Sequence, residues 1–470
     1  MLQRNPTDVL DELLACKPKT PFERDRANYC SAVSAAIAKS PEWGVAWVKT
    51  LVDRNLNDQD LWCSACQGWR NANFTAEQWK LVLDVAEKIA APEEFFSAFA
   101  EVLEHGSRRE TYTLPDEFME QAQRIAIRIW NLALKTSPVE GDSYKDWLST
   151  AINRPGGKLA KFWLQRVSSA RKAAGDTWRS LPTSISNEIS EMLRGTSGAA
   201  AHARILFASQ LHYFFSLDAS FARNELLPLF NWQSDELRAE QCWHGFLFWG
   251  RWLPGFTESL LPQFTETVIR KAQLEKRTRE HLIYHIAGIA LFRVENPLLN
   301  NWLPNQVQKL DDDERIQLAA AIDRSLDEID VSIAENIWER WLAKYWKRRA
   351  LNTPKPLLPK EATEMVCWAL SVGRHFPDAV RLIPSLGKEI DFEHAGLFWR
   401  IDEKKGLARK YPEATADLIL ICLEFPLEYF FADEHTANVW RDLSQSGVTP
   451  EKLTKIREAM FKHGYDPGQP

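Results

Sequence analysis

Apolar residues recur every three or four positions along nearly the whole chain, and this spacing constrains the fold more than any other feature. Between residues 24 and 38, one stripe of an amphipathic helix is formed by Ala27, Cys30, Val33 and Ile37. We find no run of alternating apolar and polar residues that is long enough for a sheet. The sequence therefore predicts an all-α protein.

Turn signals divide this helical pattern at regular intervals. Two helices with their turns take roughly 35 to 45 residues, which is the period of stacked helix pairs such as HEAT and tetratricopeptide repeats. We therefore expect an elongated α-solenoid of stacked helical hairpins. Leu351 to Pro359, LNTPKPLLP, is a proline-rich stretch and predicts a rigid linker. We expect a helical-repeat array over residues 1–350 and a C-terminal helical-repeat subdomain over residues 351–470, which continues the array after this linker.

Composition narrows the class of protein. Hydrophobic residues make up 45% of the chain and charged residues 26%, which is typical of a folded soluble protein. The net charge of −6 gives no support to nucleic-acid binding by bulk charge. No apolar run reaches about 18 residues, and the N-terminus lacks the apolar core of a secretory signal. Seven scattered cysteines favour reduced thiols, so we expect a cytoplasmic protein that does not bind membranes.

Two patterns of metal ligands are incomplete. Cys63 and Cys66 form a CxxC pair, but a structural zinc site needs four ligands and no second pair lies nearby. His281 and His285 share a helix face, but Leu282 stands where a metalloprotease has glutamate, and a third ligand is not evident. We interpret the cysteines as small buried side chains and the histidines as part of an interior or boundary face.

Two glycine-containing segments resemble anion-binding loops. Residues 154–158 (RPGGK) lack the spacer and the Ser or Thr of a phosphate loop, and residues 194–198 (RGTSG) place Thr196 or Ser197 as a helix N-cap. We interpret both as turns, with an anion at a helix N-terminus as the alternative. The sequence predicts no catalytic residue, no metal site and no cofactor.

Three basic stripes are candidate surfaces for contact with a macromolecule. The candidate contact residues in them are Lys158, Lys161, Arg270, Lys271, Arg277, Lys347, Arg348 and Arg349. Basic residues beside stacking aromatics can hold a nucleic-acid strand. Cations late in a helix also complement the helix dipole, so both interpretations stay open.

The stretch from Glu335 to Leu370 concentrates tryptophan. Helical spacing assigns Trp338, Trp341 and Tyr345 to a single face, which is more often a core stripe than a cofactor site. The basic tail of this helix, residues 347–349, is the part that we expect to reach the surface.

The same stretch carries a resemblance to a known family. Its pattern WxxWLxxYWxxR over residues 338–349, followed by Pro354, Pro356 and Trp368, is similar to a helical region of large bacterial anti-phage proteins. In those proteins the region lies C-terminal to a sirtuin-like, NAD-consuming domain. The likeness extends from Lys158 to the C-terminus. It implies a role in sensing phage or in holding a multimeric defence complex, and it transfers no catalytic residue. The sirtuin domain itself is absent from this sequence, so the resemblance implies a separated helical part.

These observations favour a non-enzymatic protein-binding scaffold or sensor. The resemblance implies an NAD-consuming or other effector as its protein partner, with a phage protein as the trigger. The alternative is a nucleic-acid-binding helical-repeat protein that uses the basic stripes. An enzyme with a site in a crevice of the array is the remaining alternative, although the sequence contains no constellation that would carry it.

Overall fold

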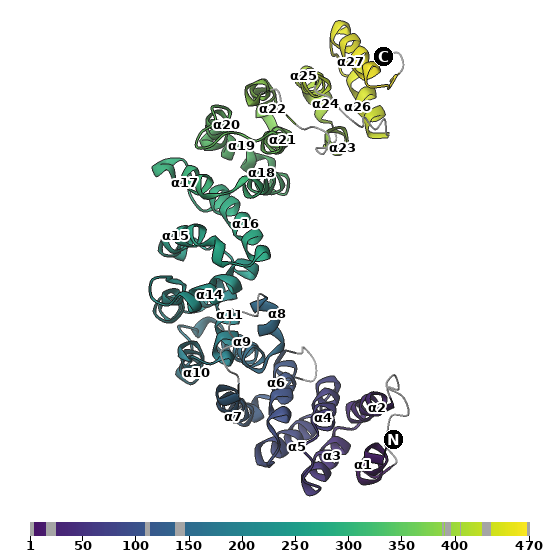
Figure 1. Ribbon diagram of the computed structural model, residues 1–470, viewed down its shortest axis with the longest axis vertical. Coiled ribbons are helices and arrows are strands. Elements are labelled where there is room, and N and C mark those ends of the chain that lie inside the picture. Colours follow the sequence, from purple (N-terminus) through teal and green to yellow (C-terminus); the bar gives the residue numbers. More distant parts are fainter. Residues whose placement is uncertain are drawn as a thin grey trace. The chain divides into compact units, whose positions relative to one another are not determined.

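The computed structural model describes residues 4–15, 25–108, 113–136, 146–387, 390, 396–404, 406–424 and 434–467 (Figure 1). The regular elements in these ranges are α-helices with short 3-10 and π turns, and the ranges contain no strand. The prediction of an all-α array of stacked helices is confirmed. None of the helices described is both long and apolar enough to span a membrane.

The chain divides into two compact units. The first comprises Met1–Arg251 with Glu258–Gln263, and the second comprises Trp252–Thr257 with Phe264–Pro470. The boundary that we expected between residues 350 and 351 lies inside the second unit.

The first unit consists of two rows of helices. One row contains α2 (Asp25–Lys39), α4 (Gln59–Asn71), α6 (Glu93–Arg108), α9 (Pro155–Ala174), α11 (Gly198–Ser209) and α14 (Glu236–Trp249), and each packs on the next. The other contains α1 (Pro6–Ala15), α3 (Pro41–Asp53), α5 (Ala76–Lys88), α7 (Met119–Thr136) and α10 (Thr183–Arg194). The short helix α8 (Trp147–Asn153) packs on α9, α11 and α14, and α12 (Leu211–Leu217) and α13 (Ala219–Phe221) precede α14.

The second unit has the same kind of packing within itself. Its helices are α15 (Pro254–Ile269), part of which belongs to the first unit, α16 (Lys276–Phe292), α17 (Trp302–Lys309), α18 (Asp312–Asp327), α19 (Val331–Ile337), α20 (Ala343–Ala350), α21 (Pro359–Trp368), α22 (Phe376–Leu382), α23 (Leu397–Glu403), α24 (Leu407–Lys410), α25 (Pro412–Leu423), α26 (Glu434–Ser444) and α27 (Pro450–Lys462). Helices α16, α18 and α21 pack in succession, and α25 packs on both α22 and α27.

Local sequence signals explain where several helices begin. Thr75 and Gln78 form a capping box at α5, with N···O distances of 3.3 and 2.9 Å. Asp311 and Glu314 form another at α18, so the acidic run there is a helix start. Ser197 caps α11, as the turn interpretation of residues 194–198 predicted.

The tryptophan-rich stretch is a core. Trp338, Trp341 and Tyr345 are each at most 3% exposed, which confirms that they form a buried stripe. The indole of Trp368 donates to the carbonyl of Ala319 at 2.9 Å and so joins α21 to α18. The aromatic side chains of this stretch therefore hold successive helices together.

A buried ion cluster holds the proline-rich stretch in place. Arg349 makes a two-pronged contact with Glu361, with Nε to Oε1 at 2.8 Å and Nη2 to Oε2 at 2.9 Å, and donates to the carbonyl of Lys355 at 2.7 Å. Arg315 donates to the carbonyl of Pro356 at 2.6 Å and lies 3.4 Å from Glu361. Arg349 is fully buried, so the expectation that it lies on a contact surface is wrong, because its charge is used inside the fold.

Candidate functional site

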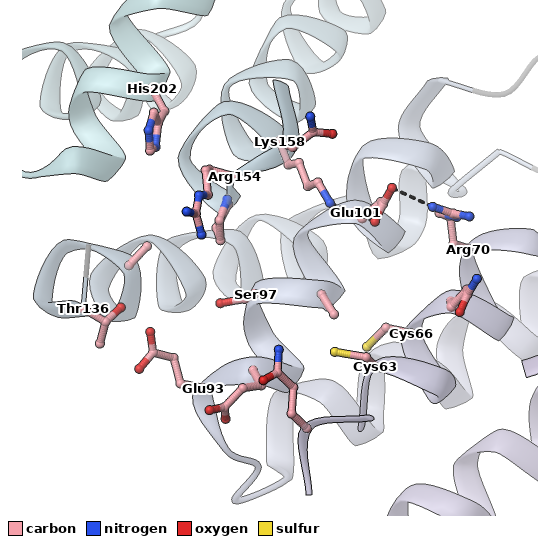
Figure 2. A pocket seen from close by; sticks show the side chains of 17 residues that line it. Cys63, Cys66, Arg70, Glu93, Ser97, Glu101, Thr136, Arg154, Lys158 and His202 are labelled. Atoms are coloured by element: carbon pink, nitrogen blue, oxygen red, sulfur yellow. Dashed lines mark hydrogen bonds and ion pairs between the residues drawn. The ribbon is translucent and has the colours of Figure 1, made fainter. Parts of the chain in front are cut away.

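A polar hollow of about 580 Å³ lies in the first unit and is lined by residues of α4, α6, α7, α8, α9 and α11 (Figure 2). We call it the first hollow. Its lining residues are Gln59, Cys63, Cys66, Gln67, Arg70, Glu93, Glu94, Ser97, Ala98, Glu101, Ala133, Thr136, Asn153, Arg154, Pro155, Lys158 and His202. The hollow thus contains two features that the sequence presents separately: the CxxC pair and part of the segment 154–158.

An ion-pair network crosses this hollow. Glu101 on α6 accepts from Arg70 Nη1 on α4 at 2.8 Å, and from Lys158 Nζ on α9 at 2.8 Å (Figure 2). Burial acts to raise the pKa of Glu101, but the hydrogen bonds from Lys158 and Arg70 outweigh burial and lower it. Glu101 therefore stays ionised at neutral pH and connects three successive helices of one row.

A second hollow of about 380 Å³ lies along the same helices. It is lined by Glu104, Arg108, Lys161, Leu164, Gln165, Ser168, Leu206, Ser209, Gln210, Tyr213 and Trp249. On α6, α9 and α11 its residues follow those of the first hollow at three- and four-residue spacing, so both hollows lie on one face of these helices. We call the two hollows together the α6–α9–α11 groove.

The predicted basic stripe on α9 lies in this groove and is paired. Lys158 contacts Glu101, and Lys161 Nζ lies 3.7 Å from Glu104 Oε1. Glu104 is only 5% exposed and lies 3.7 Å from Arg108 as well. The acidic residues of α6 therefore neutralise the cations of α9, which makes the groove mixed in charge.

The other predicted contact residues lie in the second unit. Arg270 pairs with Glu266 at 2.6 Å, and Lys271 pairs with Glu314 at the start of α18. Arg277, Lys347 and Arg348 are exposed. The structure therefore uses Arg270 and Lys271 in ion pairs, and it leaves the side chains of three predicted contact residues on the surface.

Sequence reasoning missed His202, which lines the first hollow. Helix α11 is buried along its whole length, and its other large polar side chain, Arg204, donates to the carbonyls of Leu193 and Gly195 and to Gln241. His202 is 4% exposed, and its Nδ1 has no hydrogen-bond partner among the described residues. Burial, with the nearby charges of Arg154 and Arg204, lowers the pKa of His202 to about 4. The one sign in the sequence that could have drawn attention to His202 is its place inside the apolar segment GAAAHARILFAS.

We expect His202 to make the stability of the protein depend on pH. The unfolded chain binds this proton below its usual pKa of 6.5, whereas the folded chain binds it only near pH 4. The free energy of unfolding should therefore fall as the pH decreases from 6.5 to 4, by about 3 kcal/mol at the lower limit. Denaturant unfolding of the native protein and of His202→Gln at several pH values measures this contribution. Parallel pH profiles for the two proteins would contradict it.

The cysteines of the first hollow differ in burial. Cys66 is fully buried and its Sγ lies 3.6 Å from the carbonyl of Phe95, while Cys63 is half-buried on the wall of the hollow. Burial raises the pKa of both thiols, well above the usual value for Cys66, so neither thiolate forms readily at neutral pH. The interpretation as a small buried side chain is confirmed for Cys66, whereas Cys63 is only half-buried.

The glycines of the segment 154–158 serve helix packing. A Cβ atom at Gly156 would lie 2.2 Å from the carbonyl oxygen of Ala199, and one at Gly157 would lie 1.8 Å from that of Ala151. The α8–α9 turn therefore needs both glycines because neighbouring backbone approaches closely.

The histidine pair of α16 takes part in ring contacts. His285 Nδ1 accepts from the indole of Trp252 at 2.7 Å, and His281 packs against Tyr284. Among the described residues, no group of three or more metal-ligating side chains converges there or elsewhere.

One family model matches part of the chain. It is a domain of unknown function, DUF4020, and it matches residues 291–460. No curated protein and no solved structure matches the chain. The matched stretch lies in the second unit, whereas the α6–α9–α11 groove lies in the first.

Proposed function

We propose that this chain is a non-enzymatic scaffold or sensor that binds a protein partner in the α6–α9–α11 groove. It acts with a separate effector, NAD-consuming or of another kind, in bacterial anti-phage defence. The observation that carries the proposal is a groove shared by three successive helices of one row, whose lining charges are mixed and partly paired. Stacked helical repeats typically bind other macromolecules through such shared faces.

The charge of the groove favours a protein partner over a nucleic acid. A strand of nucleic acid needs cations that follow its phosphates along a continuous track. In the groove, by contrast, Glu101 pairs with Arg70 and Lys158, and Glu104 pairs with Arg108 and Lys161. These cations already contact carboxylates, so a phosphate would have to displace those carboxylates before it could bind.

The defence role is supported by the resemblance over residues 338–368. In the second unit this stretch forms a buried core that joins α18, α20 and α21, which fits a structural part in the proposed scaffold. We therefore assign partner binding to the groove of the first unit, and the effector activity to another domain or chain.

Filling the first hollow should abolish defence without unfolding the protein. Ser97 lies half-buried in the hollow (Figure 2), so Ser97→Trp places an indole where the partner would bind. We expect phage protection to fall at least tenfold in a plating assay, with thermal unfolding close to that of the native protein. The matched control is Lys80→Trp on the exposed face of α5, outside both hollows. Equal protection by the two variants would contradict the proposal.

The nucleic-acid alternative predicts that the purified chain binds DNA or RNA, whereas our proposal predicts that it does not. We expect the purified chain to show no binding to single- or double-stranded DNA or RNA at roughly 50 mM salt, where phosphate contacts are strong. Fluorescence anisotropy with labelled oligonucleotides measures this. Binding that falls steeply with salt, and that is lost in the double variant Lys347→Gln and Arg348→Gln, would instead support the alternative.

A further inference from the structure

We infer that the helices from α23 to α27 form a hinged end of the second unit, and that two ion pairs between α23 and α18 hold it closed. The pairs are Arg400 with Asp323 and Lys404 with Asp327, and we call them the α23 latch. The hinge is the contact between α22 and α25. When the latch opens, α23 moves away from α18 and α21 while the helices stay folded. The latch lies in the second unit and does not depend on the α6–α9–α11 groove.

The spacing of the charges makes the latch a matched pair of helix faces. Arg400 Nη2 lies 2.5 Å from Asp323 Oδ2, and Lys404 contacts Asp327. The two cations stand four positions apart on α23 and the two carboxylates four positions apart on α18, so each set lies on one face of its helix. Asp327 also accepts from the hydroxyl of Ser371, directly after α21, at 3.3 Å. Charged side chains therefore connect α23 to α18.

The other contacts of α23 tie it to the C-terminal helices. Its backbone packs closely on that of α26, whereas long side chains bridge the wider space to α18. Asp402 accepts from Asn438 Nδ2 of α26 at 3.1 Å and lies 2.7 Å from His435 Nδ1. At the hinge, the ring of the buried Phe376 on α22 lies 5.8 Å from that of Tyr411 at the start of α25. Helix α23 therefore moves with α26, and an aromatic contact remains as the pivot.

The buried half of the latch gains little from closure. Asp323 is 3% exposed, and its Oδ1 has no hydrogen-bond partner among the described residues. Burial raises the pKa of Asp323, although Arg400 acts in the opposite direction. Burial and the charge of Asp323 also raise the pKa of Glu364 on the neighbouring α21. Because a buried ion pair returns little more than the cost of its desolvation, water compensates for much of the interaction that opening breaks.

The outer half of the latch responds to salt. The side chains of Lys404 and Asp327 are 33% and 44% exposed, and salt screens charges at such positions. Burial acts to raise the pKa of Asp327, but the contacts with Lys404 and Ser371 outweigh burial and lower it. Asp327 is therefore ionised at neutral pH, and the outer pair contributes most to closure at low ionic strength.

Two buried thiols lie at the joint and report its opening. Cys367 on α21 is 1% exposed and lies within hydrogen-bond reach of Arg400. Cys422 on α25 is 3% exposed, and Cys367 lies close enough to raise its pKa further. A thiol reagent reaches these side chains when the joint opens or when the unit unfolds. Cys66 and Cys242, which are buried in the first unit, serve as references.

Rates of alkylation at each cysteine, measured by mass spectrometry on the full chain, test the latch. Lys404→Glu places a carboxylate beside Asp327, so Cys367 and Cys422 should react at least about fivefold faster than in the native chain. Cys66 and Cys242 should be unchanged. Raising the salt from roughly 50 to 500 mM should also speed the reaction of Cys367 in the native chain, by at least about twofold, and should slow it in Lys404→Glu.

A charge swap shows whether the effect passes through the pair itself. Asp327→Lys alone should also speed alkylation of Cys367, whereas the double variant Lys404→Glu with Asp327→Lys should return it to within about twofold of the native rate. Lys462→Glu on the exposed end of α27 makes the same change of charge away from the joint, and should have no effect. A double variant that reacts as fast as Lys404→Glu would overturn the inference.

Amide exchange in α16 separates opening from unfolding, because α16 belongs to the same unit and lies outside the joint. In Lys404→Glu we expect its exchange to match that of the native chain while the thiols react faster. If exchange in α16 accelerates as much as alkylation does, the unit unfolds as a whole and there is no hinge. If Lys404→Glu leaves both thiols at the native rate, the ion pairs do not hold the joint and the inference is wrong.

Discussion

Glu361→Ala should lower the free energy of unfolding of the second unit by about 3 to 5 kcal/mol. The carboxylate of Glu361 contacts Arg349 at 2.8 and 2.9 Å and Arg315 at 3.4 Å. The two arginines are 0% and 4% exposed, and the substitution removes the carboxylate that both guanidinium groups share, although Arg315 keeps its contact with Asp312 at 2.6 Å. Breaking a buried ion pair by removing one partner is costly because the remaining charge stays in a poorly solvated place. Denaturant unfolding, followed together with amide exchange in α21, measures the loss.

Lys360→Ala is the matched control for this prediction. Lys360 is exposed and precedes Glu361 in the first turn of α21, so its removal should change the free energy of unfolding by less than about 0.5 kcal/mol. A second variant, Glu361→Gln, keeps the size of the side chain and removes its charge. If all three variants unfold like the native protein, the cluster does not stabilise the unit and the prediction is wrong.

Gly157→Ala should destabilise the first unit by about 3 kcal/mol or more. An added Cβ would lie 1.8 Å from the carbonyl oxygen of Ala151, which belongs to the backbone of α8 and cannot rotate away. Helices α8 and α9 would therefore have to separate, and α11 packs on both. Thermal unfolding in a buffer without phosphate or sulfate measures the loss, so that a bound anion cannot contribute.

Gly288→Ala should have the opposite effect and stabilise the protein. Gly288 lies within α16, and apart from its chain neighbours and the nearby backbone of its own helix, no described atom lies within 4 Å of the Cβ that alanine would add. Alanine has the higher helix propensity, so we expect a gain of up to about 1 kcal/mol. The packing explanation for Gly157 predicts opposite signs for the two substitutions. Losses of equal size would show that glycine is needed in these helices for a different reason.

Local signals in the sequence predicted the fold because they act within one helix. The spacing of Trp338, Trp341 and Tyr345 predicted a buried face, and the structure confirms it. The same spacing continues to Arg349, four positions after Tyr345, and so places this arginine on the buried face too. We expected a surface cation there because charge is usually solvated, and the partner that makes burial possible lies beyond a proline-rich turn.

The candidate site could not be predicted because it depends on contacts between helices. Lys158 and Glu101 are 57 positions apart, and their contact follows from how α9 packs on α6. No periodicity within α9 reveals that its cations face the acidic residues of α6. His202 was invisible for a similar reason, because a histidine among alanines gives no sign of which atoms surround it. The expected boundary at residue 350 was based on prolines alone, and hydrogen bonds hold that stretch within the second unit.

The cluster of Arg315, Arg349 and Glu361 also constrains how the protein can evolve. Losing the carboxylate first removes the counter-charge that Arg315 and Arg349 share, and losing either arginine first removes one of the two cations that neutralise Glu361. Replacing all three by apolar residues of similar size is often neutral or stabilising in other proteins. Single substitutions thus give destabilised proteins, although a protein with all three residues replaced should fold. In homologous sequences these three positions should therefore change together or not at all, even though 46 residues separate the first from the last.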